Sequence, residues 1–206
     1  KKWIMPGLNY LNHISHLKYD GQVNKFSKYK FKKIPQSAIK ENPLIIKENY
    51  FITVSEKGSI VKFVDRRKVQ WNRNVYSKKE KKKIENISLA LYKDKLYAID
   101  NLGKYYAIDV DTGKIIWVKR HKALFSSQIK VNKGKIYAVD SNNVINCFST
   151  TDGKQIWKFE TPPTFIKTNK KLSIIVTSNS VIFSNTAGDI AKVNINNGEL
   201  NWFIPT

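Results

Sequence analysis

The sequence predicts an all-β fold, a β-propeller assembled from four-stranded blades. Four segments of similar pattern follow one another, and each ends on a tryptophan: Trp71, Trp117, Trp157 and Trp202. These tryptophans are 46, 40 and 45 residues apart, and a period of about 40–45 residues is typical of propeller blades. Within each segment, short runs of alternating apolar and polar residues are separated by turn residues, which indicates antiparallel strands.

Residues 1–36 precede the repeats and are predicted to form an N-terminal arm and a ring-closing strand. Trp3, Ile4 and Met5 lie in a stretch without strand alternation, and their apolar side chains need a surface to cover them. We therefore expect an ordered arm that lies on the body of the fold. Apolar and basic residues then alternate over Phe26–Lys32, which indicates a half-buried strand with a charged outer face. We expect this strand to close the ring.

Residues 37–206 hold the four repeats, with predicted blade limits at 42–75, 87–119, 128–160 and 172–205. In the second, third and fourth blades the last hairpin turns on a glycine that follows Thr, Asp or Asn. These glycines are Gly113, Gly153 and Gly198. Glycine supplies the positive φ that a short hairpin requires. The tryptophans occupy matching positions in the outermost strands, where a large ring can fill the gap between neighbouring blades, so we interpret both sets as structural.

The composition is strongly basic, with 37 Lys and Arg against 16 Asp and Glu and a formal net charge of +21 at pH 7. Such a charge favours an anionic partner, such as lipid headgroups or an acidic protein face. A Lys-rich proteome is the other explanation, because the lysines are spread along the whole chain. No Arg-rich patch with interleaved aromatic residues stands out, so we do not expect a nucleic-acid partner.

The densest run of charge is Lys78–Lys83, between the first and second blades. Two interpretations stay open from the sequence. The run is either a solvated, mobile interblade loop or a basic handle for phosphate or lipid headgroups. A loop here also explains the long 46-residue spacing between Trp71 and Trp117.

The sequence offers few residues for catalysis or metal binding. Cys147, the one cysteine, lies in an apolar strand, where a thiol behaves as a small hydrophobic group and can form no internal disulfide. His13 and His16 would make an incomplete metal pair. We interpret His121 as an isolated surface residue near the end of a strand. No phosphate-binding loop and no pair of catalytic carboxylates can be argued from spacing. We expect no enzyme activity, no metal and no cofactor.

Two segments resemble the PQQ-like propeller repeat. They are AIDVDTGKIIW, from Ala107 to Trp117, and CFSTTDGKQIW, from Cys147 to Trp157. Propellers of the WD type have Gly-His and Trp-Asp signatures instead, and these are absent here. The resemblance identifies the architecture strongly and the function weakly, because one fold serves many functions.

The N-terminal arm narrows the resemblance to the BamB family of outer-membrane lipoproteins. The arm is similar to the start of that family at Trp3, Gly7, Asn9 and the His-Leu pair at 16–17. Phe26 stands where the family usually has Trp. The resemblance implies an eight-bladed ring at the periplasmic face of the outer membrane, lipid-anchored in the intact protein. Such proteins are non-enzymatic scaffolds that bind the periplasmic domains of BamA and help to deliver unfolded outer-membrane proteins.

The resemblance also implies a partner-binding loop. In the family, a loop after the outer strand of the third blade docks BamA with leucines and an arginine. The matching stretch here holds Phe165, Ile166 and Lys167. Two apolar anchors and a cation are the usual make-up of a small hot spot. An ordinary interblade loop is the alternative, since the family's arginine is not matched.

Four blades make about half of the ring that the resemblance implies. A half ring exposes two blade faces, and large apolar patches are not normally left bare. We therefore expect either residues beyond this sequence or self-association to cover these faces.

Two competing functions belong to other classes. Quinoprotein dehydrogenases share the repeat, which makes a ligand-binding or redox propeller the first alternative. Those enzymes need a vicinal disulfide and an acidic calcium site, whereas this sequence has one cysteine and no acidic calcium constellation. The second alternative is a peptide-sensing propeller of the kind found in some membrane kinases, which would require a membrane-spanning segment in the full gene.

Overall fold

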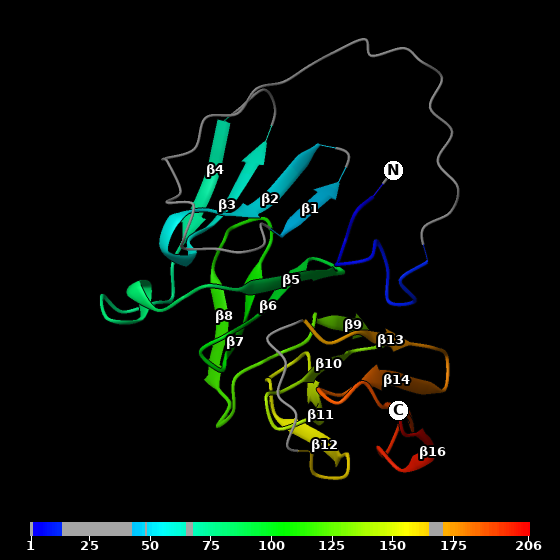
Figure 1. Cartoon of the computed structure of the whole chain (residues 1–206). Helices are drawn as coiled ribbons and strands as arrows, with labels where there is room; N and C mark the ends of the chain where they lie inside the picture. The colour runs from blue at the N-terminus through cyan, green and yellow to red at the C-terminus, as the bar shows by residue number, and fades with distance from the viewer. Residues whose placement is uncertain (1, 14–42, 48, 65–67, 165–170) are drawn as a thin grey trace, which may run out of the picture.

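The computed structural model describes residues 2–13, 43–47, 49–64, 68–164 and 171–206. These residues form four sheets of four antiparallel strands each, which confirms the predicted all-β fold of four blades (Figure 1). Two short 3-10 helices accompany them, η1 (Glu56–Gly58) and η2 (Glu80–Lys82). Within these ranges, neither helix is long and apolar enough to cross a membrane. The predicted closing strand Phe26–Lys32 lies outside the described residues.

Each blade takes its strands from one continuous stretch of chain, and the strands lie in chain order within the sheet. The first blade holds β1 (Leu44–Lys47), β2 (Tyr50–Val54), β3 (Ile60–Val64) and β4 (Lys68–Arg73). The second blade holds β5 (Ile87–Tyr92), β6 (Lys95–Asp100), β7 (Lys104–Asp109) and β8 (Ile115–Arg120). The third blade holds β9 (Lys130–Asn132), β10 (Lys135–Val139), β11 (Val144–Ser149) and β12 (Gln155–Glu160). The fourth blade holds β13 (Ile174–Val176), β14 (Ser180–Ser184), β15 (Ile190–Asn194) and β16 (Leu200–Ile204).

In the second, third and fourth blades the first strand is more buried than the last, which gives each of these blades an inner and an outer edge. In the second blade, β5 is buried along nearly its whole length, whereas β8 is mostly exposed. The apolar run ISLALY of β5 is typical of a strand covered on both faces. The first strands of the blades also contact one another, β1 with β5, β5 with β9, and β9 with β13. The first strand of each blade therefore lies innermost, nearest the N-terminal arm (Figure 1).

The hydrophobic core lies between the blades. One cluster of buried side chains joins the first and second blades, a second joins the second and third, and a third joins the third and fourth. Ile52 and Leu89 belong to the first cluster, Tyr105 and Phe148 to the second. A single sheet cannot bury its own faces, so each blade depends on its neighbours for a core.

Each interface between blades repeats one contact between a tryptophan and a glycine. The ring of Trp71 in β4 lies against Gly113, in the hairpin between β7 and β8 of the next blade. Trp117 lies against Gly153 and Trp157 against Gly198 in the same way. The three indole N–H groups donate to carbonyl oxygens of the next blade, at Val110 (2.8 Å), Thr150 (3.3 Å) and Ile195 (3.1 Å). The ring thus buries its apolar body while its one donor keeps a partner.

Trp202 occupies the same position in β16, but its side chain is partly uncovered. Its exposed fraction is 37%, against 4% for Trp71. Its neighbours Leu200 and Ile204 are also exposed. The fourth blade therefore presents an apolar outer strand that no described residue covers in the way that Gly113 covers Trp71.

Residues 2–13 form an ordered arm that crosses the innermost strands of all four blades, and its Met5 side chain is buried in the core between the second and third blades. Trp3 forms an antiparallel bridge with Ile46 of β1. The arm's backbone and amide hydrogen bonds to inner strands join Trp3 to Ile46 (2.8 and 2.7 Å), Ile4 to Leu91 (2.6 Å), Tyr10 to Val176 (2.8 Å) and Asn12 to Ile174 (3.1 Å). These bonds satisfy polar groups on strand edges that would otherwise lack a partner.

Lys130 of β9 fastens the arm to the third blade. Its side chain is fully buried, and its Nζ donates to the carbonyl oxygens of Pro6 and Asn9 and to Oδ1 of Asn12. The Asn9 contact is 2.9 Å long. All three acceptors are neutral, and burial lowers the pKa of the Lys130 ammonium to about 8.

The glycine contact predicts a position-specific cost for Gly113→Ala. A Cβ at Gly113 would lie 2.6 Å from the Trp71 ring, and φ is +69°. We expect the free energy of unfolding to fall by about 2–4 kcal/mol, from the left-handed backbone and the overpacked ring together. Denaturant unfolding measures this change.

Gly134→Ala is the matched control for that variant. Gly134 has φ +76°, but the nearest atom to its Cβ position is 3.7 Å away. We expect this variant to lose only the backbone contribution, about 1–2 kcal/mol. Equal losses in the two variants would contradict the assigned role of the tryptophan–glycine contact.

Lys130 predicts a rise in stability at alkaline pH. Its pKa is about 8 in the folded protein and 10.5 ordinarily, so between these values the unfolded chain binds more protons. The free energy of unfolding should therefore increase from about pH 8 to about pH 10.5, by up to about 3 kcal/mol. Comparison with Lys130→Met removes the titration of the other groups. A constant difference between the two proteins over this pH range would contradict the prediction.

Candidate functional site

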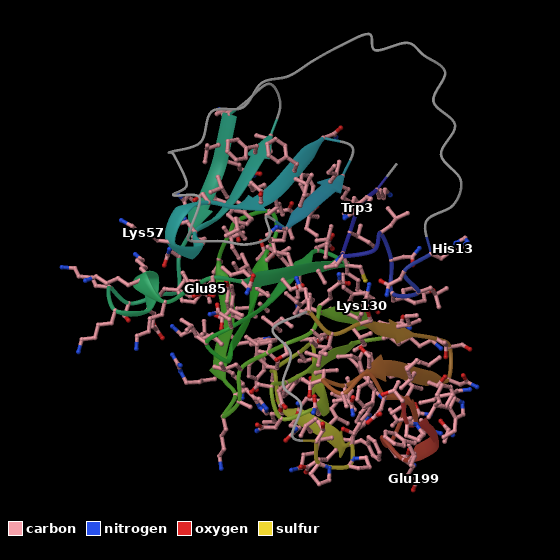
Figure 2. All side chains as sticks on the ribbon, viewed as in Figure 1. Trp3, His13, Lys57, Glu85, Lys130 and Glu199 are labelled. Atoms are coloured by element: carbon pink, nitrogen blue, oxygen red, sulfur yellow. The ribbon has the colours of Figure 1, made fainter. Side chains whose placement is uncertain are left out.

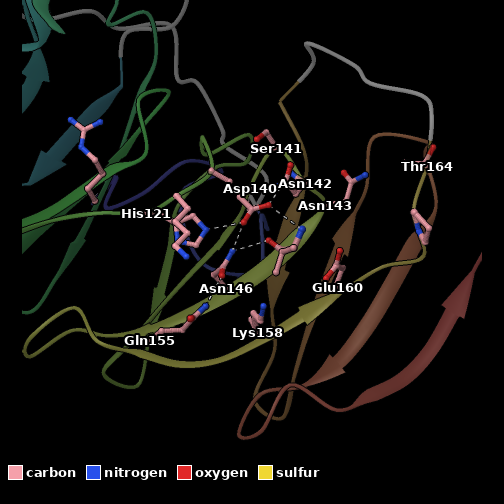
Figure 3. A pocket seen from close by; sticks show the side chains of 15 residues that line it. His121, Asp140, Ser141, Asn142, Asn143, Asn146, Gln155, Lys158, Glu160 and Thr164 are labelled. Atoms are coloured by element: carbon pink, nitrogen blue, oxygen red, sulfur yellow. Dashed lines mark hydrogen bonds and ion pairs between the residues drawn. The ribbon is translucent and has the colours of Figure 1, made fainter.

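A hollow of about 660 Å³ lies on the third blade, between the linker that enters the blade and the linker that leaves it (Figure 3). The entering linker supplies His121, and the hairpin between β10 and β11 supplies Asp140. Strands β11 and β12 supply the floor. The other lining residues are Arg120, Lys122, Ala123, Ser141, Asn142, Asn143, Val144, Asn146, Gln155, Lys158, Glu160, Pro163 and Thr164.

Asp140 is the centre of the hydrogen bonds in this pocket. Its Oδ1 accepts from the backbone N–H groups of Asn142 (2.9 Å) and Val144 (3.2 Å), which closes the β10–β11 hairpin. Its Oδ2 lies 2.9 Å from His121 Nε2 and accepts from Asn146 Nδ2 at 3.0 Å. Burial acts to raise the pKa of Asp140, but these hydrogen bonds outweigh it and the net pKa is lowered. Asp140 is thus held as a carboxylate.

His121 is not the isolated surface residue that the sequence predicts. Its side chain is only 19% exposed, and its ring stacks on Phe125 at 5.3 Å between centroids. Asp140, its hydrogen-bond partner, is 19 residues away in the chain, in the hairpin between β10 and β11 of the third blade. His121 does lie near the end of a strand, as predicted, because it directly follows β8. Its predicted isolation was wrong, because short-range sequence patterns do not report a contact with Asp140.

The His121–Asp140 contact has equivalents at the other interfaces. The hydroxyl of Tyr76, after the first blade, donates to Asp100 Oδ2 at 2.6 Å. Thr161, after the third blade, lies 3.4 Å from Asn185 Nδ2. Each partner sits where the second strand of its blade ends. His121 and Thr161 each lie four residues after a blade tryptophan, and Tyr76 lies five residues after Trp71. This nearly constant spacing is the signal that could have found His121.

The lining of the pocket is polar and largely cationic. The lining includes three cationic residues, Arg120, Lys122 and Lys158, and one exposed carboxylate, that of Glu160, together with several amides. Ser141 lines the pocket, yet the described residues show no hydrogen bond between its hydroxyl and His121. The arrangement lacks the linked nucleophile and base of a hydrolase and is suited to polar or anionic groups.

Glu80 joins the first linker to the second blade. Its carboxylate accepts from Lys104 Nζ at 2.8 Å and from the backbone N–H of Ser77 at 2.8 Å. Arg120, on the pocket rim, donates to the other oxygen. The hydrogen bond from Lys104, followed by that from Ser77, lowers the pKa of Glu80 to about 2.

The predicted partner residues Phe165, Ile166 and Lys167 lie outside the described residues. The two residues that lead into them, Pro163 and Thr164, line the pocket. The predicted loop therefore begins at the pocket rim.

Cys147 is a buried free thiol, as expected, and burial raises its pKa to about 12. His13 is described and exposed, whereas His16 is not described. Within the described ranges, no three His, Cys, Asp or Glu side chains gather in a group that could hold a metal ion.

The four-stranded blades and their repeated interface define the class of protein, a propeller built from PQQ-like repeats. A family model described as outer membrane protein assembly factor BamB matches residues 56–206. The chain belongs to this family. No curated protein matches the sequence.

Several solved structures share the fold. A quinohemoprotein alcohol dehydrogenase from Pseudomonas putida superposes with a TM-score of 0.77 at 14% identity, covering 100% of this chain and 40% of that chain. One from Comamonas testosteroni gives 0.72 at 13% identity, covering 99% and 41%. BamB from Moraxella catarrhalis gives 0.66 at 12% identity, covering 85% and 53%. The chain thus spans about half or less of their lengths, and at these identities the likeness shows the fold alone.

Glu80 predicts an acid-sensitive contribution to stability. We expect Glu80→Gln to lower the free energy of unfolding by about 1 kcal/mol near neutral pH, because the ion pairs with Lys104 and Arg120 are lost. The folded pKa is about 2 and the ordinary value 4.5, so the contribution is complete above pH 4.5 and disappears as the pH falls toward 2. Denaturant unfolding of both proteins across this range measures it. Glu160→Gln, at an exposed carboxylate, is the control, and a gap that does not narrow in acid would contradict the assignment.

Proposed function

We propose that this chain is a non-enzymatic scaffold of the outer-membrane β-barrel assembly machinery. It binds the periplasmic domains of a BamA-like protein and assists the delivery of unfolded outer-membrane proteins. The observation that carries the proposal is the BamB family match over residues 56–206. The site chemistry supports it, because the pocket offers polar and cationic groups for recognition and no linked nucleophile and base.

The proposed location follows from the same family. A protein with this role sits at the periplasmic face of the outer membrane, where a lipid anchor holds the intact protein. A buried, unreactive thiol at Cys147 is compatible with that compartment.

The proposed contact is the loop after the third blade. Phe165 and Ile166 supply the apolar anchors and Lys167 a cation, and the loop begins at the pocket rim at Thr164. Lys122 and Lys158 add positive charge to the pocket that Thr164, the residue before this loop, also lines. We propose that apolar and acidic side chains of the partner bind here together.

Calorimetry with the purified periplasmic domains of the cognate BamA tests the function and the site. We expect micromolar binding that the double variant Phe165→Ala/Ile166→Ala weakens by at least about tenfold, the usual loss for two truncated anchors. Leu124→Ala is the matched control, because Leu124 is a 49% exposed apolar residue in the preceding interblade linker. Binding that survives the double variant would keep the function and move the site, whereas no binding by the wild type would contradict the function.

A quinoprotein-type ligand-binding or redox propeller is the second candidate, because two quinohemoprotein alcohol dehydrogenases superpose over nearly the whole chain. Thermal unfolding with pyrroloquinoline quinone and calcium separates the candidates. A rise in the melting temperature supports the second candidate, and an unchanged value disfavours it.

We also propose that the chain self-associates through the exposed outer strand of the fourth blade, which carries Trp202. Sedimentation velocity tests this proposal.

A further inference from the structure

The basic loop, residues 78–83, is a folded turn. Residues 80–82 form η2, and the backbone N–H groups of Lys83 and Ile84 donate to the carbonyl oxygen of Glu80 at 2.9 and 3.0 Å. Ser77 and Glu80 exchange side-chain and backbone hydrogen bonds at its start. Ile84 is buried and anchors its end in the core between the first two blades. The lysines are thus displayed from a fixed position.

The one acid inside the loop is turned inward. The Glu80 carboxylate forms ion pairs with Lys104 and Arg120, which belong to the second blade. The lysines point the other way: Lys78, Lys79, Lys82 and Lys83 are exposed, and Lys81 is half-buried. Figure 2 shows the long side chains of this loop, between the labels Lys57 and Glu85, extending away from the blades. The loop therefore presents ammonium groups outward while its own carboxylate is neutralised within the fold.

Two further carboxylates at this end of the blades are held by internal hydrogen bonds, whereas Glu160, at the end of β12 in the third blade, is exposed. Asp100 accepts from Tyr76, and Asp140 from His121 and Asn146. Both aspartates are buried. Glu85, which follows the loop, is exposed and offsets part of its charge. Residues 77–86 still carry five lysines against two glutamates, so the outward charge is positive.

The residue types in the loop favour anionic lipid over nucleic acid as the partner. Residues 77–86 contain no arginine and no aromatic residue. Arginine forks and aromatic stacking are the usual devices for reading nucleic acids, whereas lysines act as flexible point charges. Clusters of four to eight basic residues bind anionic lipid headgroups without specific geometry.

We propose that the basic loop binds the propeller to an anionic phospholipid surface, with the exposed ammonium groups of its lysines facing the lipid phosphates. This end of the blades then faces the bilayer. The inference does not depend on the proposed scaffold function, because it rests on the loop alone.

Flotation of the full chain with phospholipid vesicles tests the inference. Vesicles of phosphatidylcholine alone are compared with vesicles of equal parts phosphatidylcholine and phosphatidylglycerol. We expect binding to the anionic vesicles only, and steep weakening with salt. Changing Lys78, Lys79, Lys82 and Lys83 to Gln should lower the partition coefficient on the order of a thousandfold, given the typical contribution of each lysine near such a surface.

The matched control changes Lys93, Lys114, Lys133 and Lys154 to Gln. These four lysines are also exposed and lie in hairpins at the opposite end of the second and third blades. Their substitution removes the same charge. The control should bind vesicles as the wild type does, and both variants should keep the wild-type melting temperature. Equal losses in the two variants, no preference for anionic vesicles, or displacement of the vesicles by a DNA duplex would each overturn the proposal. BamA binding, measured separately, reports on the scaffold function.

Discussion

The contact between an indole ring and a glycine of the next blade is the constraint on which the rest of the structure depends. A four-stranded blade has two apolar faces and cannot bury either alone. Trp71, Trp117 and Trp157 each complete one interface, and the glycine opposite leaves room for the ring. The clusters of buried side chains form only where two blades meet. Stability is therefore a sum of interface contributions between neighbours, as in other repeat proteins.

At the end of the blades where the interblade linkers run, the polar contacts between blades vary more than the contacts between tryptophan and glycine. The three equivalent contacts are Tyr76 with Asp100, His121 with Asp140, and Thr161 with Asn185. All three close an interface, but they differ in charge and in size. The repeated fold places a polar side chain at this position in each interface. The type of side chain differs, and it affects what the neighbouring surface can bind. The pocket lies beside the one histidine among these positions.

Local patterns in the sequence were enough to predict the blades. Strand alternation, the tryptophan period and the glycine turns are short-range signals, and each arises from backbone geometry. The contacts of the candidate site could not be predicted from such local patterns. Asp140 and His121 meet only because two blades pack together, and Lys130 reads as one basic residue in a strand until the arm covers it. Glu80 lies in a run of lysines, and nothing nearby in the sequence indicates that Lys104 and Arg120 bind it.

The arm that crosses the inner strands has a consequence for the order of folding. The blades are local units, so each can form its hairpins soon after synthesis, with few long loops to close. The arm is made first but finds its last partner late, since Asn12 binds Ile174, 162 residues further along. Full docking of the arm thus waits for the fourth blade. Until then the edges of the inner strands are unprotected, and the newly made chain is most exposed to mispairing with other strands.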